Sequence, residues 1–494
     1  MFDSAEIGHK VGKREFRKAE DVLRTALLDA QYELLESRAF SVVVLVNGVE
    51  GAGKGETVNL LTKWMDPRHI EVRGFDEPST EEAERPYMWR FWRVLPPRGK
   101  QCVMFGDWYA GALRERLAKE TSATVFEHRL DEINRFEAML AREQVVLVKL
   151  WFHLSKAAQK RRFDTLSADD RTRWRVTEED WAAHERYDRS RELAEAMLRA
   201  TDSASAPWIV IDSEDANHRS LAAGRAVLEA ITRQLARSHE ASAGGASRPE
   251  LPALPDRRTF LDTLDLAQKF SRKEYDEQLE VLQGRLALLT RHKAFRKRSL
   301  VLVFEGMDAA GKGGAIRRVT AALDARHYRV IPVAAPTDEE AARPYLWRFW
   351  RHVPRQGKTV IFDRSWYGRV LVERVEGFAA EPDWMRAYGE INDFEQTLEE
   401  AGAVVVKFWL AISSDEQLRR FREREAEAHK RFKITPEDWR NRHNWAAYEE
   451  AVCDMLERTG GPRPWTLVEA DNKHFARIKV LRTICERLEA ALAA

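Results

Sequence analysis

A glycine-rich segment in the C-terminal half has the residue types and spacing of a phosphate-binding loop. Gly306-Met307-Asp308-Ala309-Ala310-Gly311-Lys312 fits G-x-x-x-x-G-K, directly after an apolar run and before a helical pattern. Glycines let backbone N–H groups turn toward an anion, and the start of a helix adds partial positive charge. We therefore expect Lys312 to act on a transferred phosphoryl group. The backbone of the loop is assigned to Gly306, Ala310, Gly311, Gly313 and Gly314.

Two carboxylates near this loop are candidate Mg²⁺ ligands. Gly313 stands where Ser or Thr normally helps to hold the metal, so another group is needed, and Asp308 lies within the loop. Asp363 and Arg364 follow the apolar run TVIF, and α/β sheets bind ligands at the carboxyl ends of their strands. We expect Asp363 to hold Mg²⁺ and Arg364 to offset phosphoryl charge. The alternative is an ion pair at the end of a strand.

A run of basic residues that begins at Leu418 has two interpretations. It is either a solvated helix face or a lid that closes over bound phosphates and excludes water. The neighbouring phosphate loop favours the lid. The run contains Arg419, Arg420, Arg422, Arg424, Lys430, Arg431 and Lys433.

An aromatic block, Tyr345-Leu346-Trp347-Arg348-Phe349-Trp350, is expected to lie mainly in the core. Its arginines can instead face an acceptor nucleotide. Arg343 and Arg348 are therefore candidate nucleotide-binding residues.

The chain contains this arrangement of motifs twice. The segment that begins at Ser41 resembles the one that begins at Ser299, and the offset is constant, since Lys312 minus Lys54 and Trp347 minus Trp89 are both 258. RPYMWRFWR recurs as RPYLWRFWR, and EINRFEAML recurs as EINDFEQTL. The repeat indicates a duplicated domain.

Each copy has the pattern of an α/β domain. A helical segment opens the copy, and a buried strand at 42–46 or 300–304, the loop and a helix follow. Apolar runs at 359–363 and 404–410 predict further strands between helical stretches, which favours a parallel sheet covered on both faces. A stretch rich in Ser, Ala, Gly and Pro indicates a linker. The predicted boundaries are 1–236 for the first domain, 237–256 for the linker and 257–494 for the second domain.

The composition argues against several classes of protein. The 81 basic and 80 acidic residues give a net charge of +1, so there is no global field for nucleic acid or membrane. No apolar run approaches the ~20 residues that span a bilayer, and the polar start does not resemble a secretory leader. Three cysteines without metal-ligand spacing fit a reducing compartment. We expect a cytoplasmic protein with no nucleic-acid or membrane partner.

With these motifs in order, the second half resembles the family-2 polyphosphate kinases of the P-loop kinase superfamily. The resemblance rests on GMDAAGKGG, RPYLWRFW, FDRSWYGRVLVERV, EINDFE, KFWLAIS, LRRF, KRFKIT and ADNKHFAR. The two-domain layout is similar to the polyphosphate:AMP phosphotransferase subgroup. The resemblance implies two tandem P-loop kinase-like domains, each a parallel sheet flanked by helices with a helical lid. It also implies a catalytic group of Asp308, Lys312, Asp363 and Arg364, and lid residues Arg420, Arg424, Lys430 and Lys433.

The first copy keeps the loop but lacks several of its neighbours. Asp107 lies near the position that corresponds to Asp363, but it would need a local bulge to reach the same site. We expect the first copy to be weak or inactive and to serve as a built-in partner for the second. The differences are Glu50 for Asp308, Phe105-Gly106 for Asp363-Arg364, Leu166 for Arg424 and Thr172 for Lys430, whereas Gly48, Gly53 and Lys54 are kept.

The resemblance implies transfer of the terminal phosphoryl group of inorganic polyphosphate to AMP, with Mg²⁺ as cofactor. The phosphate of AMP is largely ionised near neutral pH, so positioning and charge neutralisation suffice for catalysis. One alternative is an ATP-dependent nucleoside monophosphate kinase, and another is a non-catalytic regulator that binds polyphosphate or nucleotide. The choice of acceptor among AMP, GMP and diphosphates stays open. We expect either a homo-oligomer or an intramolecular pseudo-dimer.

Overall fold

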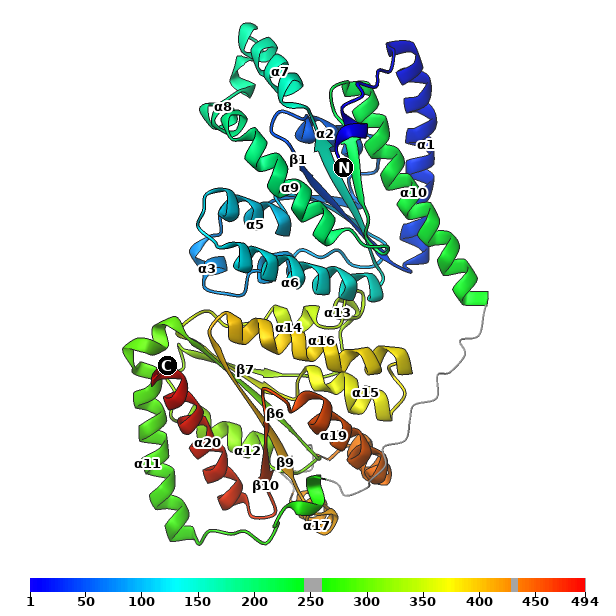
Figure 1. Cartoon of the computed structure of the whole chain (residues 1–494). Coiled ribbons are helices and arrows are strands. Elements are labelled where there is room, and N and C mark those ends of the chain that lie inside the picture. Colours follow the sequence, from blue (N-terminus) through cyan, green and yellow to red (C-terminus); the bar gives the residue numbers. More distant parts are fainter. Residues whose placement is uncertain (244–259, 428–433, 494) are drawn as a thin grey trace. The chain divides into compact units, whose positions relative to one another are not determined.

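Two parallel five-stranded sheets form the framework of the chain, one in each half (Figure 1). The structure, a computed structural model, describes residues 1–243, 260–427 and 434–493. The strand order is β2-β3-β1-β4-β5 in the first sheet and, in the matching direction, β7-β8-β6-β9-β10 in the second. The strands are β1 (Ser41–Gly48), β2 (Ile70–Gly74), β3 (Gln101–Phe105), β4 (Val145–His153), β5 (Trp208–Asp212), β6 (Ser299–Gly306), β7 (Tyr328–Pro332), β8 (Thr359–Asp363), β9 (Ala403–Ala411) and β10 (Trp465–Glu469).

Helices alternate with these strands along the chain, as parallel pairing requires. In the first half they are α1 (Lys13–Ser37), α2 (Lys54–Trp64), α3 (Thr80–Ala83), α4 (Trp89–Trp92), α5 (Trp108–Leu117), α6 (Ala123–Arg142), α7 (Lys156–Ala168), α8 (Glu178–Glu185), α9 (Tyr187–Thr201) and α10 (Ala216–Ala243). In the second half they are α11 (Arg272–Arg291), α12 (Lys312–Thr320), α13 (Asp338–Ala341), α14 (Trp347–Trp350), α15 (Val372–Val375), α16 (Glu381–Glu400), α17 (Ser414–Ala426), α18 (Pro436–His443), α19 (Trp445–Thr459) and α20 (Lys473–Ala493).

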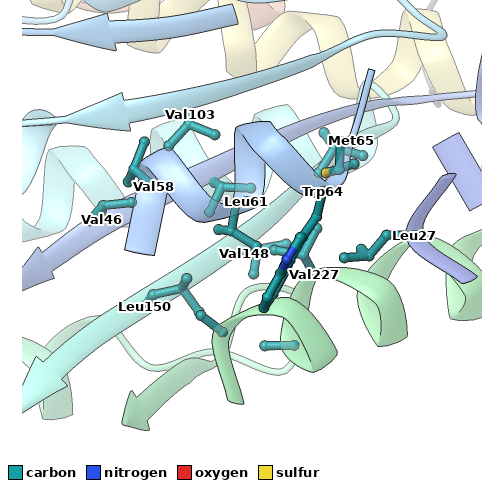
Figure 2. Packing of buried hydrophobic residues seen from close by; sticks show 14 of the residues in the cluster. Leu27, Val46, Val58, Leu61, Trp64, Met65, Val103, Val148, Leu150 and Val227 are labelled. Atoms are coloured by element: carbon teal, nitrogen blue, oxygen red, sulfur yellow. The ribbon is translucent and has the colours of Figure 1, made fainter. Parts of the chain in front are cut away.

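One face of the first sheet is covered by α1, α2 and α10, whose apolar residues form a single core with the strands. Figure 2 shows Leu61 and Trp64 of α2 packed with Val148 of β4 and Val227 of α10. The strand residues 42–46 are all buried, because a central parallel strand has helices on both of its faces. The second half repeats this core with α11, α12 and α20.

A buried ion pair lies on the other face of each sheet. In the second half the Lys407 ammonium contacts the Glu395 carboxylate at 2.8 Å, and both side chains are fully buried. Glu395 also accepts hydrogen bonds from Trp366 and Tyr367, which fixes the segment that follows the end of β8. Lys149 and Glu137 form the same pair in the first half.

The predicted fold class is confirmed. The expected strands at 42–46, 300–304, 359–363 and 404–410 lie within β1, β6, β8 and β9, and the two sheets belong to two compact units. The short strands β2, β5, β7 and β10 are additional to those expected. The domain boundaries stay a prediction: α10 extends to Ala243, inside the expected linker 237–256, and residues 244–256 lie outside the described residues.

Candidate active site

The predicted loop joins β6 to α12 and has the backbone that a phosphate loop requires. Gly306 has φ +149°, and a Cβ there would lie 2.6 Å from the carbonyl oxygen of Leu410, so only glycine fits. Gly311 is the N-cap of α12 with φ +110°, and Lys312 is the first helical residue. The loop therefore leads into the N-terminus of α12, where backbone N–H groups without helical partners favour an anion.

Lys312 lies over this loop. Its ammonium donates to the carbonyl oxygens of Gly306 at 2.6 Å and Met307 at 3.3 Å. Burial and the neighbouring guanidinium of Arg364 lower the pKa of Lys312, although nearby carboxylates oppose the shift. Among the described residues the lysine donates to these two backbone carbonyl groups and to no carboxylate, which suits it to a phosphate ligand.

Arg364 reaches the same loop from the end of β8. Its Nη2 donates to Oδ1 of Asp308 at 2.9 Å. Its backbone has φ +64°, a left-handed conformation that costs a residue with a Cβ roughly 1–2 kcal/mol. This backbone conformation holds the Arg364 side chain at the loop. We infer that the strained conformation is kept because the guanidinium is needed there.

Asp308 is held in position by three neighbours. Arg364 binds one carboxylate oxygen, Asn441 of α18 donates to the other at 2.8 Å, and Gln417 of α17 donates to the backbone carbonyl at 3.1 Å. Asn441 and Gln417 were not expected from the sequence, because no local pattern shows that α17 and α18 reach the loop.

The two predicted metal ligands fit Mg²⁺ by their chemistry. The charges of both Asp308 and Asp363 act on Lys312 and Arg364, which places all four groups in one electrostatic neighbourhood. Mg²⁺ is typically bound through one or two carboxylates together with substrate phosphates and water. Within residues 1–243, 260–427 and 434–493, no cluster of three or more His, Cys, Asp or Glu residues could hold a metal ion.

A buried hydrogen-bonded pair, Glu305 and Ser365, was not expected from the sequence, and Glu305 directly precedes the loop. Oγ of Ser365 donates to Oε1 of Glu305 at 2.8 Å, and Glu305 is almost completely buried. Burial raises the pKa of Glu305, and the Ser365 hydroxyl offsets part of this shift. The pair links the end of β6 to the segment after β8, and it could have been suspected only from the position of Glu305 next to Gly306.

A pocket opens beside these groups. It joins the end of β6, the loop and the end of β8 to α17, α18 and α19. It is lined by Glu305, Gly306, Met307, Asp308, Arg364, Gly368, Leu371, Val372, Trp409, Gln417, Asn441 and Tyr448.

The structure places Arg420 beneath the loop rather than on a solvent-exposed lid. The residue is buried, and its five N–H donors are all taken. They contact Oε1 of Glu416 and the carbonyl oxygens of Ala309, Ala310, Ala470 and Asp471. In this conformation Arg420 fixes the loop and has no donor left for polyphosphate.

The other predicted lid and nucleotide residues lie in several places. Arg424 is in the last turn of α17, whereas Lys430 and Lys433 lie outside the described residues. The Arg343 guanidinium stacks on the ring of Trp347, 4.3 Å from its centroid. Arg348 donates to the carbonyl oxygen of Ala334 at 2.7 Å, and it is not among the residues that line the pocket.

The first half keeps the shape of the loop. Gly48, Gly51 and Gly53 have positive φ angles, as do Gly306, Ala309 and Gly311 at the corresponding positions. Lys54 also donates to the loop carbonyls, but it forms an additional ion pair with Glu50 at 3.1 Å.

The neighbours of the first loop differ. Gly106 takes the left-handed backbone of Arg364 with φ +78° and supplies no side chain. Asp107 is buried, where it accepts hydrogen bonds from Asn47 at 2.6 Å and from the backbone of Tyr109 at 2.9 Å. Its carboxylate is therefore engaged with Asn47 and the N-terminus of α5.

None of the helices in the described part of the chain is both long and apolar enough to span a bilayer.

Comparison with known proteins gives concordant matches over nearly the whole chain. The family model of polyphosphate kinase 2 matches residues 10–239 and 269–493. The chain is 53% identical over 492 residues to the polyphosphate:AMP phosphotransferase of Pseudomonas aeruginosa, covering 99% of both proteins. It is 40% identical over 478 residues to the protein of the same name from Acinetobacter johnsonii, covering 95% of this chain and 96% of the other.

A solved structure gives the same result for the fold. The crystal structure of a protein described as polyphosphate kinase 2 from Pseudomonas aeruginosa PA01 superimposes with a TM-score of 0.89 at 52% identity, covering 99% of each chain.

Proposed function

The chain belongs to the polyphosphate kinase 2 family, and we propose that it transfers the terminal phosphoryl group of inorganic polyphosphate to AMP, which yields ADP. The observation that carries this proposal is the group of Lys312, Arg364 and Asp308 around one loop, with Asp363 at the end of the adjacent strand. Relatives similar along their whole length, named for the same reaction, support the choice of donor and acceptor.

The reaction needs little proton chemistry from the protein. A phosphate oxygen of AMP forms a bond to the terminal phosphorus, and the bond from that phosphorus to the bridging oxygen breaks. The electron pair stays on the bridging oxygen, which becomes the new end of a chain shortened by one phosphate. Because both substrates are anions, the protein must mainly align them and neutralise charge, for which we assign Lys312 and Arg364.

We assign Asp308 and Asp363 as the residues that would hold Mg²⁺, which neutralises phosphate charge when bound. Asp308 is already oriented by Arg364 and Asn441, so its carboxylate has a fixed direction. We also assign Arg343 and Arg348 to the nucleotide, and Arg424, Lys430 and Lys433 to the polyphosphate chain.

We propose that the first half does not catalyse the reaction and acts as a built-in partner within a pseudo-dimer. Gly106 cannot neutralise phosphoryl charge, and Asp107 is engaged elsewhere. The cytoplasmic location expected from the sequence stays a prediction.

A donor and acceptor comparison tests the function. Purified full-length protein with Mg²⁺ and AMP should form ADP when inorganic polyphosphate is the donor, and much more slowly when ATP is the donor. Faster turnover with ATP would favour a nucleoside monophosphate kinase, and no turnover with either donor would favour a binding regulator. GMP and nucleoside diphosphates, offered in the same assay, determine the acceptor.

A further inference from the structure

A carboxylate of the first half lies at the start of the helix that follows its loop. Glu56 lies in the first turn of α2, two residues after Lys54. It accepts hydrogen bonds from three guanidinium groups, with Arg219 at 2.8 Å and Arg162 and Arg175 at 3.1 Å each. One negative charge is thus surrounded by three positive charges at the N-terminus of a loop helix.

The three arginines come from the elements that surround the loop. Arg162 lies in α7, Arg175 in the short 3₁₀ segment Arg173–Arg175 before α8, and Arg219 in α10. With the offset of 258, Arg162 corresponds to Arg420 and Arg175 to Lys433, which lies outside the described residues. The last helices begin at Ala216 and Lys473, an offset of 257, so Ala476 stands at the position of Arg219 and Arg477 follows it. Among the described residues of the second half, Arg420 donates to the loop carbonyl oxygens of Ala309 and Ala310, and Arg477 lies beside Gly314 of the loop helix.

Arg219 lies directly against the loop. It is almost completely buried, and a Cβ on Gly53, the N-cap of α2, would lie 2.3 Å from its Cζ. Its Nε donates to Thr57 at 3.0 Å. The Arg219–Glu56 pair therefore lies at the N-terminus of the loop helix, the end of a helix that favours an anion.

The electrostatics agree with this geometry. Burial alone would raise the pKa of Glu56, but the charges and hydrogen bonds of Arg162 and Arg219 outweigh it and lower the pKa. The carboxylate is therefore ionised at neutral pH and competes with any phosphate for the same guanidinium groups.

The described loop helix of the second half, α12, has no carboxylate at the matching position. Gly314 stands at the position of Glu56, and Nη2 of Arg477 lies 3.3 Å from where its Cβ would be. Each loop helix thus has an arginine beside its first turn, Arg219 at Gly53 and Arg477 at Gly314, and the side chain at position 56 or 314 differs.

We propose that the first loop is a folded phosphate site closed by its own Glu56 carboxylate, and that replacing this residue opens a second site for inorganic polyphosphate. The proposal goes beyond the function assigned to the second half, because it concerns binding rather than transfer. It explains why the loop keeps its backbone geometry although the charge of the nearby arginines is already neutralised by Glu56.

Binding measurements on the full-length chain test the proposal. A Lys312→Ala/Arg364→Ala background weakens the second site, and calorimetric titration with tripolyphosphate then compares this background with and without Glu56→Gly. We expect one additional site per chain, with at least tenfold tighter binding than in the background. Residues 169–177, which contain Arg175, should also gain protection from hydrogen exchange. Identical binding in the two proteins, or protection of 169–177 before Glu56 is replaced, would overturn the proposal.

Two further variants keep the test decisive. Glu56→Gln removes the charge but keeps the side-chain length, so it should bind tripolyphosphate more tightly than the background, and it decides the question if Glu56→Gly does not fold.

Gly314→Glu should lower polyphosphate-dependent ADP formation at least tenfold, and more than Gly314→Gln does. Equal turnover of Gly314→Glu and the unmodified chain would contradict the proposal. Glu56→Gly alone should keep full turnover, which separates this test from that of the proposed function.

Discussion

At the scale of single residues, the site holds one side chain in an unfavourable backbone conformation. Arg364 has φ +64°, whereas Gly106 adopts φ +78° at the same position of the first half. Glycine accepts this conformation without a steric cost, but it cannot reach Asp308 or a phosphate. The second half therefore gives up some stability to place a guanidinium at the loop.

Replacing Arg364 by Ala or Gly should separate these two effects. Both variants lack the charge, so kcat/KM should fall in each by the equivalent of about 3–4 kcal/mol. Gly removes the strain and Ala keeps it. The free energy of unfolding should therefore be about 1 kcal/mol larger for Arg364→Gly than for Arg364→Ala. Steady-state kinetics and urea unfolding measure the two quantities. Unchanged turnover would exclude Arg364 from the reaction.

The two loop lysines provide a matched pair for locating the reaction. Lys312→Ala should abolish most ADP formation, because Lys312 is the only one of the two lysines without a carboxylate among its hydrogen-bond partners. Lys54→Ala should leave turnover nearly unchanged, since Lys54 pairs with Glu50 and lies in the half that lacks an arginine at position 106. Loss of activity in Lys54→Ala with normal activity in Lys312→Ala would reverse the assignment of the two halves.

At the scale of elements, α17 supports the loop through one buried residue. Arg420 donates all five of its N–H groups to protein acceptors. Arg420→Ala would leave several buried carbonyl groups and Glu416 without their partner, so it should lower the free energy of unfolding by about 3–5 kcal/mol. Arg422→Ala, on the exposed face of the same helix, should change it by less than about 0.5 kcal/mol. Urea unfolding of both variants measures the difference, and equal stabilities would show that Arg420 does not anchor the loop.

The elements also show what local sequence could predict. The central strands were predictable because residues such as 300–304 form continuous apolar runs, which burial on both faces of a parallel sheet demands. The edge strand β7 carries Arg329 and Pro332, and all of its residues are partly or fully exposed, so burial imposes no continuous apolar run on it. The contact of Asn441 with Asp308 depends on tertiary packing of α18, which a motif alone does not reveal.

At the scale of the whole molecule, the two halves share a frame but distribute charge differently within it. In each half, a buried carboxyl group links the end of the central strand, β1 or β6, to the segment that follows the neighbouring strand of the sheet, β3 or β8. In the first half Asp107 accepts from Asn47, and in the second half Glu305 accepts from Ser365. The acid thus stands at opposite members of an equivalent pair: it is the N-cap of α5 in the first half and lies within the central strand β6 in the second.

This arrangement predicts a dependence of stability on pH in the first half. Burial raises the pKa of Asp107 from 3.8 to about 7, so the folded chain retains a proton that the unfolded chain loses. The contribution to stability is complete below pH 4 and is lost as the pH rises toward 7, with a slope of at most about 1.4 kcal/mol per pH unit. Urea unfolding between pH 5 and pH 8 should therefore show that Asp107→Asn gains stability over the unmodified chain as the pH rises. The control Asp131→Asn, at an exposed position of α6, should follow the unmodified chain at every pH. Parallel curves for Asp107→Asn and the unmodified chain would show that Asp107 is ionised in the folded protein, and that the hydrogen bonds of Asn47 and Tyr109 outweigh its burial.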